Sequence, residues 1–310
     1  MSTPPTPQKT RDHLQRHQWL RILGRTAKTP RGAVGLSLML LVIGVAIIGP
    51  FVAPDQPNAL LTMPFAHASS THWLGADTLG RDVLSRVLNG GWVLLVMAAA
   101  ATVLGVAAGT VAGVSAAYLR GRWDGLIMRT VDVVLAFPQM VFALLLVSVF
   151  GPKLWLIVIA VGMSHAPQVA RVVRSATLEI SERDFVKAVE LWGVKARLVM
   201  SREILPNIVS PLMVEVGLRL TYSVVIISGL AFLGFGQAPP APNWGYMITE
   251  NLEGAQGNIW TVVAPALLIA LLTVGTNTFT DAVARVAIGV NRKHEDVAII
   301  ESAELGAPIG

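Results

Sequence analysis

The sequence predicts an all-α membrane protein whose chain crosses the bilayer six times. Of its 310 residues, 53% are hydrophobic and only 14% are charged, whereas a soluble domain usually carries about 25% charged residues. Six apolar runs are long enough to form helices that cross a hydrocarbon core of about 30 Å. Lysine and arginine gather in alternate segments between these runs. Composition therefore argues against a soluble fold, and the basic segments predict how the chain is threaded.

The first part of the chain predicts a basic segment followed by one membrane helix. Residues 1–31 hold seven basic residues and the single acid Asp12, so we expect a cytoplasmic segment that includes a short interfacial helix. Residues 32–54 form the first span, which ends at Pro54 and Asp55. A cleavable signal peptide is the alternative interpretation, but this apolar run is longer and begins later than the apolar part of such peptides.

Residues 55–90 predict an extracytoplasmic loop, because charged residues and glycines interrupt the apolar pattern and only an amphipathic stretch remains. Residues 91–290 predict the main transmembrane domain, and residues 291–310 a cytoplasmic tail. A short linker, residues 151–153, joins the third span to the fourth, so these two spans should form an antiparallel hairpin. The five spans of the main domain are expected at residues 92–118, 133–150, 154–170, 208–236 and 259–280.

The distribution of lysine and arginine predicts that both termini are cytoplasmic. Cytoplasmic segments of membrane proteins carry an excess of basic residues. With the N-terminus inside, the inside segments 1–31, 119–130 and 171–207 hold seven, three and seven basic residues, whereas the outside loops hold only Arg81, Arg86 and Lys153. The net charge of +5 is thereby explained by membrane topology, and a nucleic-acid partner is not expected.

Small and charged residues inside the spans suggest how the helices meet. Gly105, Gly109 and Gly113 recur at every fourth position of the second span, which lets a neighbouring helix approach closely. Glu215 and Arg219 of the fifth span lie one helical turn apart and are expected to pair, either as part of a translocation pathway or as a structural anchor. Asp281 and Arg285 have the same spacing near the inner end of the sixth span, where a structural anchor is favoured.

Neither a catalytic nor a metal-binding constellation is evident in the sequence. It has no H-E-x-x-H motif, no G-x-x-x-x-G-K-[ST] phosphate loop and no cysteine. His67 and His72 share the outer loop but lack a third ligand, so no metal site is predicted. His165 is interpreted as a packed or interfacial histidine at the inner end of the fourth span. We therefore expect no catalytic residue and no cofactor bound by this chain itself.

The inside segment at residues 171–207 carries the strongest local pattern. It is long enough for two short helices, predicted at residues 184–192 and 195–204, with a break at Gly193 and a stop at residues 205–207. Four apolar residues of the first helix share one face at helical spacing, namely Phe185, Ala188, Val189 and Trp192. In a cytoplasmic loop, such a face must be buried against a partner. Binding to the lipid surface is the alternative.

This segment resembles the cytoplasmic loop signature of bacterial ATP-binding-cassette (ABC) importer permeases, which reads E-A-A-x3-G-x9-I-x-L-P. Ala188, Gly193, Leu205 and Pro206 match the signature. Other positions depart from it, since Lys187 stands at the Glu, Val189 at the second Ala and Glu203 at the Ile. The peptide/nickel branch of the family is itself loose at these positions.

Three further stretches resemble the second, C-type permease of dipeptide and oligopeptide importers. Residues 72–82 are similar to its outer-loop motif H-W-L-G-T-D-x-x-G-R-D, and residues 232–245 to its F-L-G-x-G-x-x-P-P-x-P-x-W-G. Residues 128–138 match its M-R-x-x-D segment with the following proline. The matches occur in the order of the family and extend over about residues 70–290.

The resemblance implies a type I ABC importer permease in the bacterial inner membrane that forms half of a pathway for peptides. A second homologous permease would complete a heterodimer, two cytoplasmic ATPase subunits would use ATP and Mg²⁺, and a substrate-binding protein would deliver solute from outside. Nickel or another small solute is the alternative cargo. A self-contained secondary transporter or channel would instead show inverted halves or broken helices, and the sequence indicates neither. A membrane enzyme would show clustered catalytic groups. The resemblance assigns ATPase coupling to Asp184, Phe185, Lys187, Ala188, Glu190, Trp192, Gly193, Arg197, Leu205 and Pro206.

Overall fold

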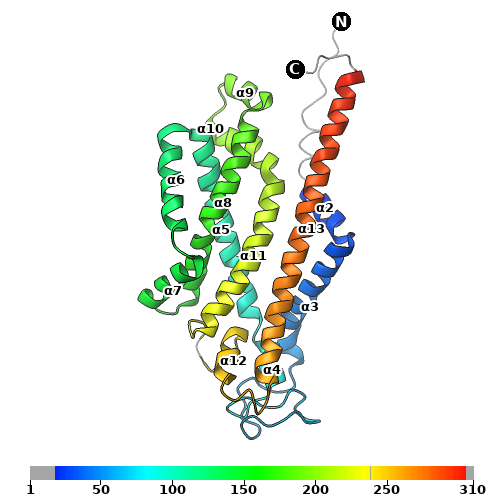
Figure 1. Ribbon diagram of the computed structural model, residues 1–310, viewed down its shortest axis with the longest axis vertical. Helices are drawn as coiled ribbons and strands as arrows, with labels where there is room; N and C mark the ends of the chain where they lie inside the picture. Colours follow the sequence, from blue (N-terminus) through cyan, green and yellow to red (C-terminus); the bar gives the residue numbers. More distant parts are fainter. Residues whose placement is uncertain (1–17, 238, 305–310) are drawn as a thin grey trace.

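The computed structural model describes residues 18–237 and 239–304, and shows a bundle of long helices in this part of the chain (Figure 1). Helix α9 and the C-terminal end of α13 lie at one end of the bundle, and the loop between α3 and α4 lies at the other with α12. Only isolated β-bridges occur within the described ranges. The helices are α2 (Gln18–Ala27), α3 (Pro30–Val52), α4 (Val83–Asn89), α5 (Trp92–Leu119), α6 (Gly121–Leu135), α7 (Gln139–Phe150), α8 (Leu154–Ser181), α9 (Asp184–Leu191), α10 (Ala196–Leu198), a π-helical turn (Val199–Ile204), a 3-10 turn (Leu205–Ile208), α11 (Val209–Phe232), α12 (Trp244–Asn251) and α13 (Trp260–Glu304).

Five of the six predicted spans coincide with long apolar helices, namely α3, α5, α8, α11 and α13. Three of these helices differ in length from the prediction. Helix α8 continues to Ser181, well beyond the expected end at residue 170. Helix α11 ends at Phe232 rather than at residue 236. Helix α13 continues to Glu304, so the segment predicted as a tail begins as helix.

The third predicted span, residues 133–150, is broken rather than straight. Helices α6 and α7 meet at an angle of 83° across Ala136, Phe137 and Pro138. Proline lacks the backbone N–H that continues a helix, and it disfavours helical geometry in the residue before it. Helix α7 has 12 residues and is therefore about 18 Å long, too short to cross the membrane alone. The expectation that the chain holds no broken helix is thus wrong at this position.

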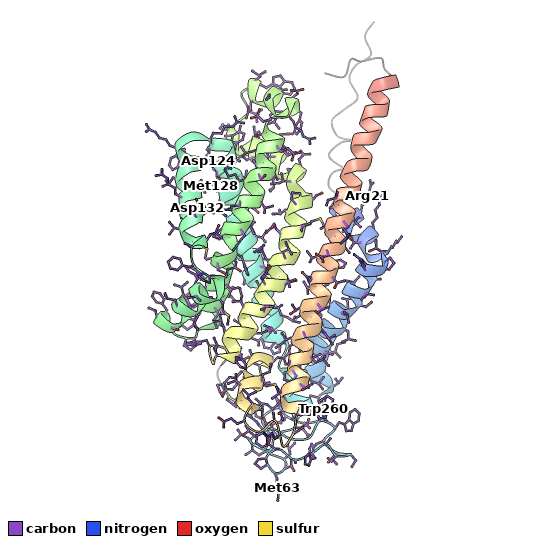
Figure 2. All side chains as sticks on the ribbon, viewed as in Figure 1. Arg21, Met63, Asp124, Met128, Asp132 and Trp260 are labelled. Atoms are coloured by element: carbon purple, nitrogen blue, oxygen red, sulfur yellow. The ribbon has the colours of Figure 1, made fainter. Side chains whose placement is uncertain are left out.

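Acidic side chains of α6 attach this bent pair to α8. Asp124 and Asp132 lie on one helix face, two turns apart (Figure 2). Arg174 of α8 donates to both carboxylate oxygens of Asp124, at 2.7 and 2.6 Å, and Arg171 donates to Asp132 at 2.6 Å. The ion pairs neutralise both acidic residues of α6.

The predicted close approach at the glycine stripe is confirmed. Gly105, Gly109 and Gly113 of α5 pack directly on the backbone of α8. A Cβ atom at these positions would lie 2.6, 2.6 and 2.5 Å from the carbonyl oxygens of Gly162, Ala166 and Ala170. Because real Cβ contacts essentially never fall below 3.0 Å, only glycine fits at all three.

Replacing Gly109 with leucine is therefore expected to destabilise the folded chain by about 1–3 kcal/mol, since α5 must move away from α8. The matched control is Gly125→Leu in α6, where no atom lies within 4 Å of an added Cβ. Thermal unfolding of the purified chain in detergent measures both. Equal melting of Gly109→Leu and Gly125→Leu would show that the helices do not depend on this contact.

The predicted interfacial helix near the N-terminus corresponds to α2, while residues 1–17 lie outside the described ranges. Ile22 of α2 is buried against Val283 and Ala287 of α13. Thr26 lies in the last turn of α2, and Thr29 caps the start of α3. The Thr29 hydroxyl accepts a hydrogen bond from the Gly32 N–H at 3.1 Å. The short helix is therefore part of the bundle rather than a free amphipathic segment.

Candidate functional site

The segment from Asp184 to Pro206, to which the resemblance assigns ATPase coupling, forms an elbow between α8 and α11 at one end of the molecule (Figure 1). Helix α9 occupies the outer part of the elbow. Gly193 has a φ of +73°, a backbone conformation that glycine adopts without strain, and it reverses the chain before α10. Since a Cβ at Gly193 would meet nothing within 4 Å, conformation rather than space requires glycine there.

The predicted stop at residues 205–207 is wrong. The chain instead stays helical from Ala196 through the π-helical and 3-10 turns into α11, as far as Phe232. Pro206 lies in the first positions of the 3-10 turn, where the hydrogen-bond pattern of the continuous helix changes. The elbow is thereby joined to α11 without an extended linker.

The apolar residues around α9 divide between a buried anchor and an outward set that includes two residues of the predicted face. Val186 is fully buried and Val189 packs with it against Val199 and Ile204. Phe185 and Trp192, which were predicted to share a face with Val189, are 40% and 75% exposed. Leu191, which the prediction did not single out, is 87% exposed. The elbow is held by the valines and presents its larger apolar side chains outward.

Charged groups at the base of α9 are partly paired. Glu182 accepts a hydrogen bond from Arg120 and forms an ion pair with Lys187 at 3.3 Å. These contacts, that with Arg120 first, hold the pKa of the Glu182 carboxyl below its usual value. The other predicted coupling positions divide by exposure: Asp184, Glu190 and Arg197 are exposed, and Ala188, Leu205 and Pro206 are half-buried.

The predicted pair of Glu215 and Arg219 is confirmed in α11. Both side chains are buried, and Arg219 Nε lies 3.1 Å from Glu215 Oε2. The Arg219 guanidinium also lies 5.3 Å from the ring centroid of Tyr222, a distance that permits a cation–π interaction. The predicted pair of Asp281 and Arg285 is wrong, because both side chains are exposed and no ion pair joins them. An exposed pair gains little free energy from contact.

A chain of polar side chains crosses the bundle one turn beyond Arg219. His165 Nε2 lies 3.0 Å from Ser223 Oγ, which lies 3.2 Å from Thr102 Oγ1. On the other side of the histidine ring, Gln139 Nε2 lies 3.3 Å from Nδ1. Because α8 is longer than predicted, His165 lies in mid-helix and is fully buried rather than at the end of a span.

The sequence interpretation missed Ser223, Thr102 and Gln139. Ser223 could have been identified from its spacing. Glu215, Arg219 and Ser223 follow one another at intervals of four residues, so the three form one polar stripe on α11. Thr102 and Gln139 come from α5 and α7. No local spacing connects those two helices with α11.

The opposite end of the molecule is closed by a buried ion network. Arg81 Nη2 and Arg86 Nη2 bind the two oxygens of Glu250 in α12 at 2.8 and 2.9 Å. Asp77 Oδ2 lies 2.6 Å from Arg81 Nε and 3.2 Å from Arg86 Nε. Trp244 is fully buried and donates from Nε1 to the Val87 carbonyl at 2.7 Å. Arg81 and Arg86, two of the three basic residues predicted in the outside loops, are thus buried, and ion pairs with Asp77 and Glu250 neutralise their charge.

A helical bundle that crosses the membrane several times, buries a polar stripe and exposes an apolar elbow at one end has the architecture of a membrane transport subunit. Residues 105–287 match the family model described as binding-protein-dependent transport system inner membrane component. The chain belongs to this family, that of the ABC importer permeases.

Curated relatives cover most of the chain. It is 32% identical over 249 residues to a putative peptide transport system permease protein of Brucella suis, covering 80% of this chain and 84% of the relative. It is 32% identical over 269 residues to the dipeptide transport system permease protein DppC of Alkalihalophilus pseudofirmus, covering 85% and 87%. It is 34% identical over 268 residues to the glutathione transport system permease protein GsiD of Escherichia coli, covering 86% and 88%.

Proposed function

We propose that this chain forms one half of the translocation pathway of an ABC importer for peptides and performs no catalysis. The observation that carries the proposal is the elbow at α9, where Leu191 and Trp192 are exposed at 87% and 75% while Val186 beneath them is buried. Large exposed apolar side chains on a well-anchored element are typical of a protein interface. The names of the relatives, which include peptide, dipeptide and glutathione permeases, support peptide-like cargo.

The partner at the elbow is a cytoplasmic ATPase subunit that uses ATP and Mg²⁺. Each of two permeases, this chain and a homologous second one, receives one ATPase on its elbow, and a substrate-binding protein docks at the opposite end near α12. Both chain termini lie on the cytoplasmic side. The excess of basic residues in the segments at the elbow end supports this orientation.

Coupling follows from the continuity of the helices that flank the elbow. Helix α8 enters it, and the helix from Ala196 to Phe232 leaves it and carries the stripe of Glu215, Arg219 and Ser223. An ATPase that binds one position of the elbow more tightly than another shifts the populations of the two states of the permease. The polar stripe would then be presented to one side of the membrane or the other.

Nickel or another small solute remains the alternative cargo, and uptake of labelled dipeptide against labelled nickel distinguishes the two. The broken span of α6 and α7 is a feature that a secondary transporter would also show. Family membership favours the ATPase-driven importer over that possibility.

Replacing Trp192 with aspartate is expected to abolish co-purification of the ATPase subunits and to lower peptide uptake at least about tenfold, because a charge at the centre of an apolar contact loses several kcal/mol. The matched control for ATPase co-purification is Trp73→Asp, since Trp73 is exposed to a similar extent, 71%, at the opposite end, where no ATPase is proposed to bind. Affinity purification of the tagged chain from its source, followed by mass spectrometry, identifies the partners. Retention of the ATPase by Trp192→Asp would contradict the proposed docking.

A further inference from the structure

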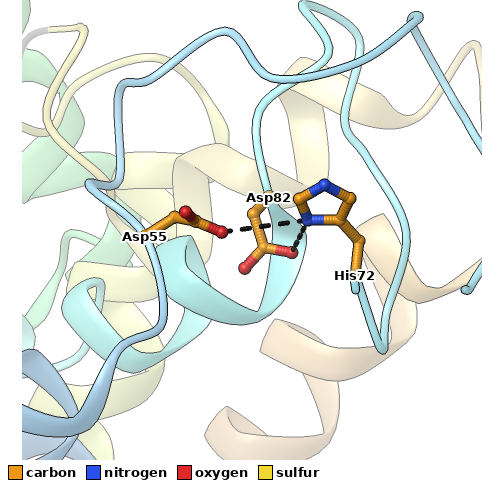
Figure 3. Close-up of side chains that lie close together, drawn as sticks. All are labelled: Asp55, His72 and Asp82. Carbon is orange, nitrogen blue, oxygen red and sulfur yellow. Dashed lines mark ion pairs between the residues drawn. The ribbon is translucent and has the colours of Figure 1, made fainter. Parts of the chain in front are cut away.

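Three side chains of the outer loop converge on one point (Figure 3). Asp55 follows α3, His72 lies in the middle of the loop and Asp82 precedes α4. His72 Nδ1 lies 3.3 Å from Asp82 Oδ1 and 3.9 Å from Asp55 Oδ2. One potential ligand atom from each residue lies within 4.8 Å of the other two. Two carboxylates and an imidazole form a typical donor set for a borderline-soft divalent cation.

Hydrogen bonds of the surrounding backbone fix these three residues. The Asp55 N–H donates to Ser85 Oγ at 3.0 Å. Asp82 caps α4, because its Oδ2 accepts from the Ser85 N–H at 2.7 Å, which leaves Oδ1 directed at the cluster. The His72 N–H donates to Ser69 Oγ at 3.1 Å, and its carbonyl accepts from the Gly75 N–H at 2.9 Å. The chain is therefore held in place by contacts other than those at the convergence point.

Two atoms at the convergence point are buried and lack a hydrogen-bond partner. The Asp82 side chain is 1% exposed, and its Oδ1 accepts no hydrogen bond. His72 Nδ1 is buried as well and makes none, since the 3.3 Å contact between the two lacks hydrogen-bond geometry. Buried polar atoms are nearly always satisfied, and a buried carboxylate oxygen without a partner is costly. A cation between the two atoms would satisfy both at once.

We propose that Asp55, His72 and Asp82 bind a divalent transition cation, with Zn²⁺ the best fit. Tetrahedral Zn²⁺ with bonds of about 2.0–2.2 Å places neighbouring ligand atoms about 3.4 Å apart. The separation of 3.3 Å between His72 and Asp82 meets this requirement. The separation of 3.9 Å between His72 Nδ1 and Asp55 Oδ2 shortens to this value with a small movement of the Asp55 side chain, which is 33% exposed. Two carboxylates balance the charge of the ion, and water completes the fourth position.

The bound ion would connect the end of α3, the outer loop and the start of α4. The same loop carries Asp77 and Arg81, which bind Glu250 of α12 directly or through the network. The sequence prediction of no metal site counted histidines alone. The carboxylates lie 17 residues before and 10 residues after His72 in the chain, so no short motif indicates them.

Zinc binding by the full-length chain tests the proposal directly. The chain is purified in detergent through a tag without histidine, stripped with a chelator and titrated with Zn²⁺ against a chromophoric chelator. Wild type and His67→Gln are expected to bind one Zn²⁺ per chain and to melt at a higher temperature with the metal. His72→Gln and Asp55→Asn are expected to bind at least about tenfold more weakly and to gain no thermal stability. His67 is the matched control, because it is an exposed histidine of the same loop that lies outside the cluster.

Metal-free melting and size-exclusion profiles show whether each variant is folded. If His72→Gln misfolds, the Zn²⁺ affinity of Asp55→Asn decides the test, because Asp55 is partly exposed and its substitution disturbs the fold less. The proposal is overturned if the wild-type chain binds no zinc, or if Asp55→Asn binds it as tightly as wild type does.

Discussion

Replacing Arg86 with methionine is expected to lower the free energy of unfolding by about 3–5 kcal/mol, the cost of removing one partner from a buried ion network. The Arg86 side chain is 1% exposed and lies between Asp77 and Glu250. Its Nη1 also approaches the carbonyls of Pro57 and Pro240 at 3.4 Å. Methionine fills similar space but leaves two acids with Arg81 as their remaining counter-charge. The loop and α12 would then separate.

Two further variants sharpen this prediction. Arg86→Lys keeps the charge but loses the planar fork that reaches both acids, so an intermediate loss is expected. Arg183→Met removes a partner of Glu179 in an exposed i,i+4 pair, so its effect should stay within about 1 kcal/mol. Thermal and denaturant unfolding in detergent provide the comparison. If Arg86→Met and Arg183→Met melt together, the network contributes nothing to the closure of the outer end.

Replacing Glu215 with leucine is expected to destabilise the folded chain by about 3–5 kcal/mol, because Arg219 would remain buried without a counter-charge. The double variant Glu215→Leu with Arg219→Met removes both charges and should recover most of the stability. Peptide uptake should nevertheless stay low in the double variant, since the proposed pathway would lose the charged part of its polar stripe.

This combination separates the two interpretations of the pair. Unfolding measurements on both single variants and the double variant yield the coupling energy between the two residues. Asp281→Leu is the control, because Asp281 is exposed and not paired with Arg285. A double variant that is stable and transports peptide at the wild-type rate would make Glu215 and Arg219 a structural anchor only.

Features with a local period were predictable from the sequence. The glycines at positions 105, 109 and 113 predicted a close helix contact, and the i,i+4 spacing of Glu215 and Arg219 predicted their pairing. A helix brings such residues to one face. Spacing alone was not sufficient, however, because Asp281 and Arg285 have the same spacing but are exposed and unpaired, whereas Glu215 and Arg219 are buried. Hydropathy located five spans. It failed at residues 133–150, where Pro138 breaks an apolar run without changing its hydropathy.

Features that depend on distant parts of the chain could not be predicted in this way. Arg81 and Glu250 are 169 residues apart, and Ser223 and Thr102 are 121 apart. Helical spacing indicated which apolar residues of α9 share a side, but not that Val186, which is outside that set, anchors the helix. Val186 is buried by the elbow itself. The exposed Trp192 is available for a partner.

The π-helical turn at Val199–Ile204 explains how the departures from the loop signature are accommodated. The buried residues here are Val199, Ile204 and Ile208, at intervals of five and then four. A regular α-helix returns to the same side after three or four residues, which would turn Arg202 or Glu203 toward the core. The wider turn, with its i→i+5 pattern, brings Ile204 inward instead. Because this turn holds one residue more than an α-helical turn, deleting one residue from it would leave an ordinary helix and keep the elbow in register with α11. The same deletion within the regular part of α11 would rotate the elbow by about 100°.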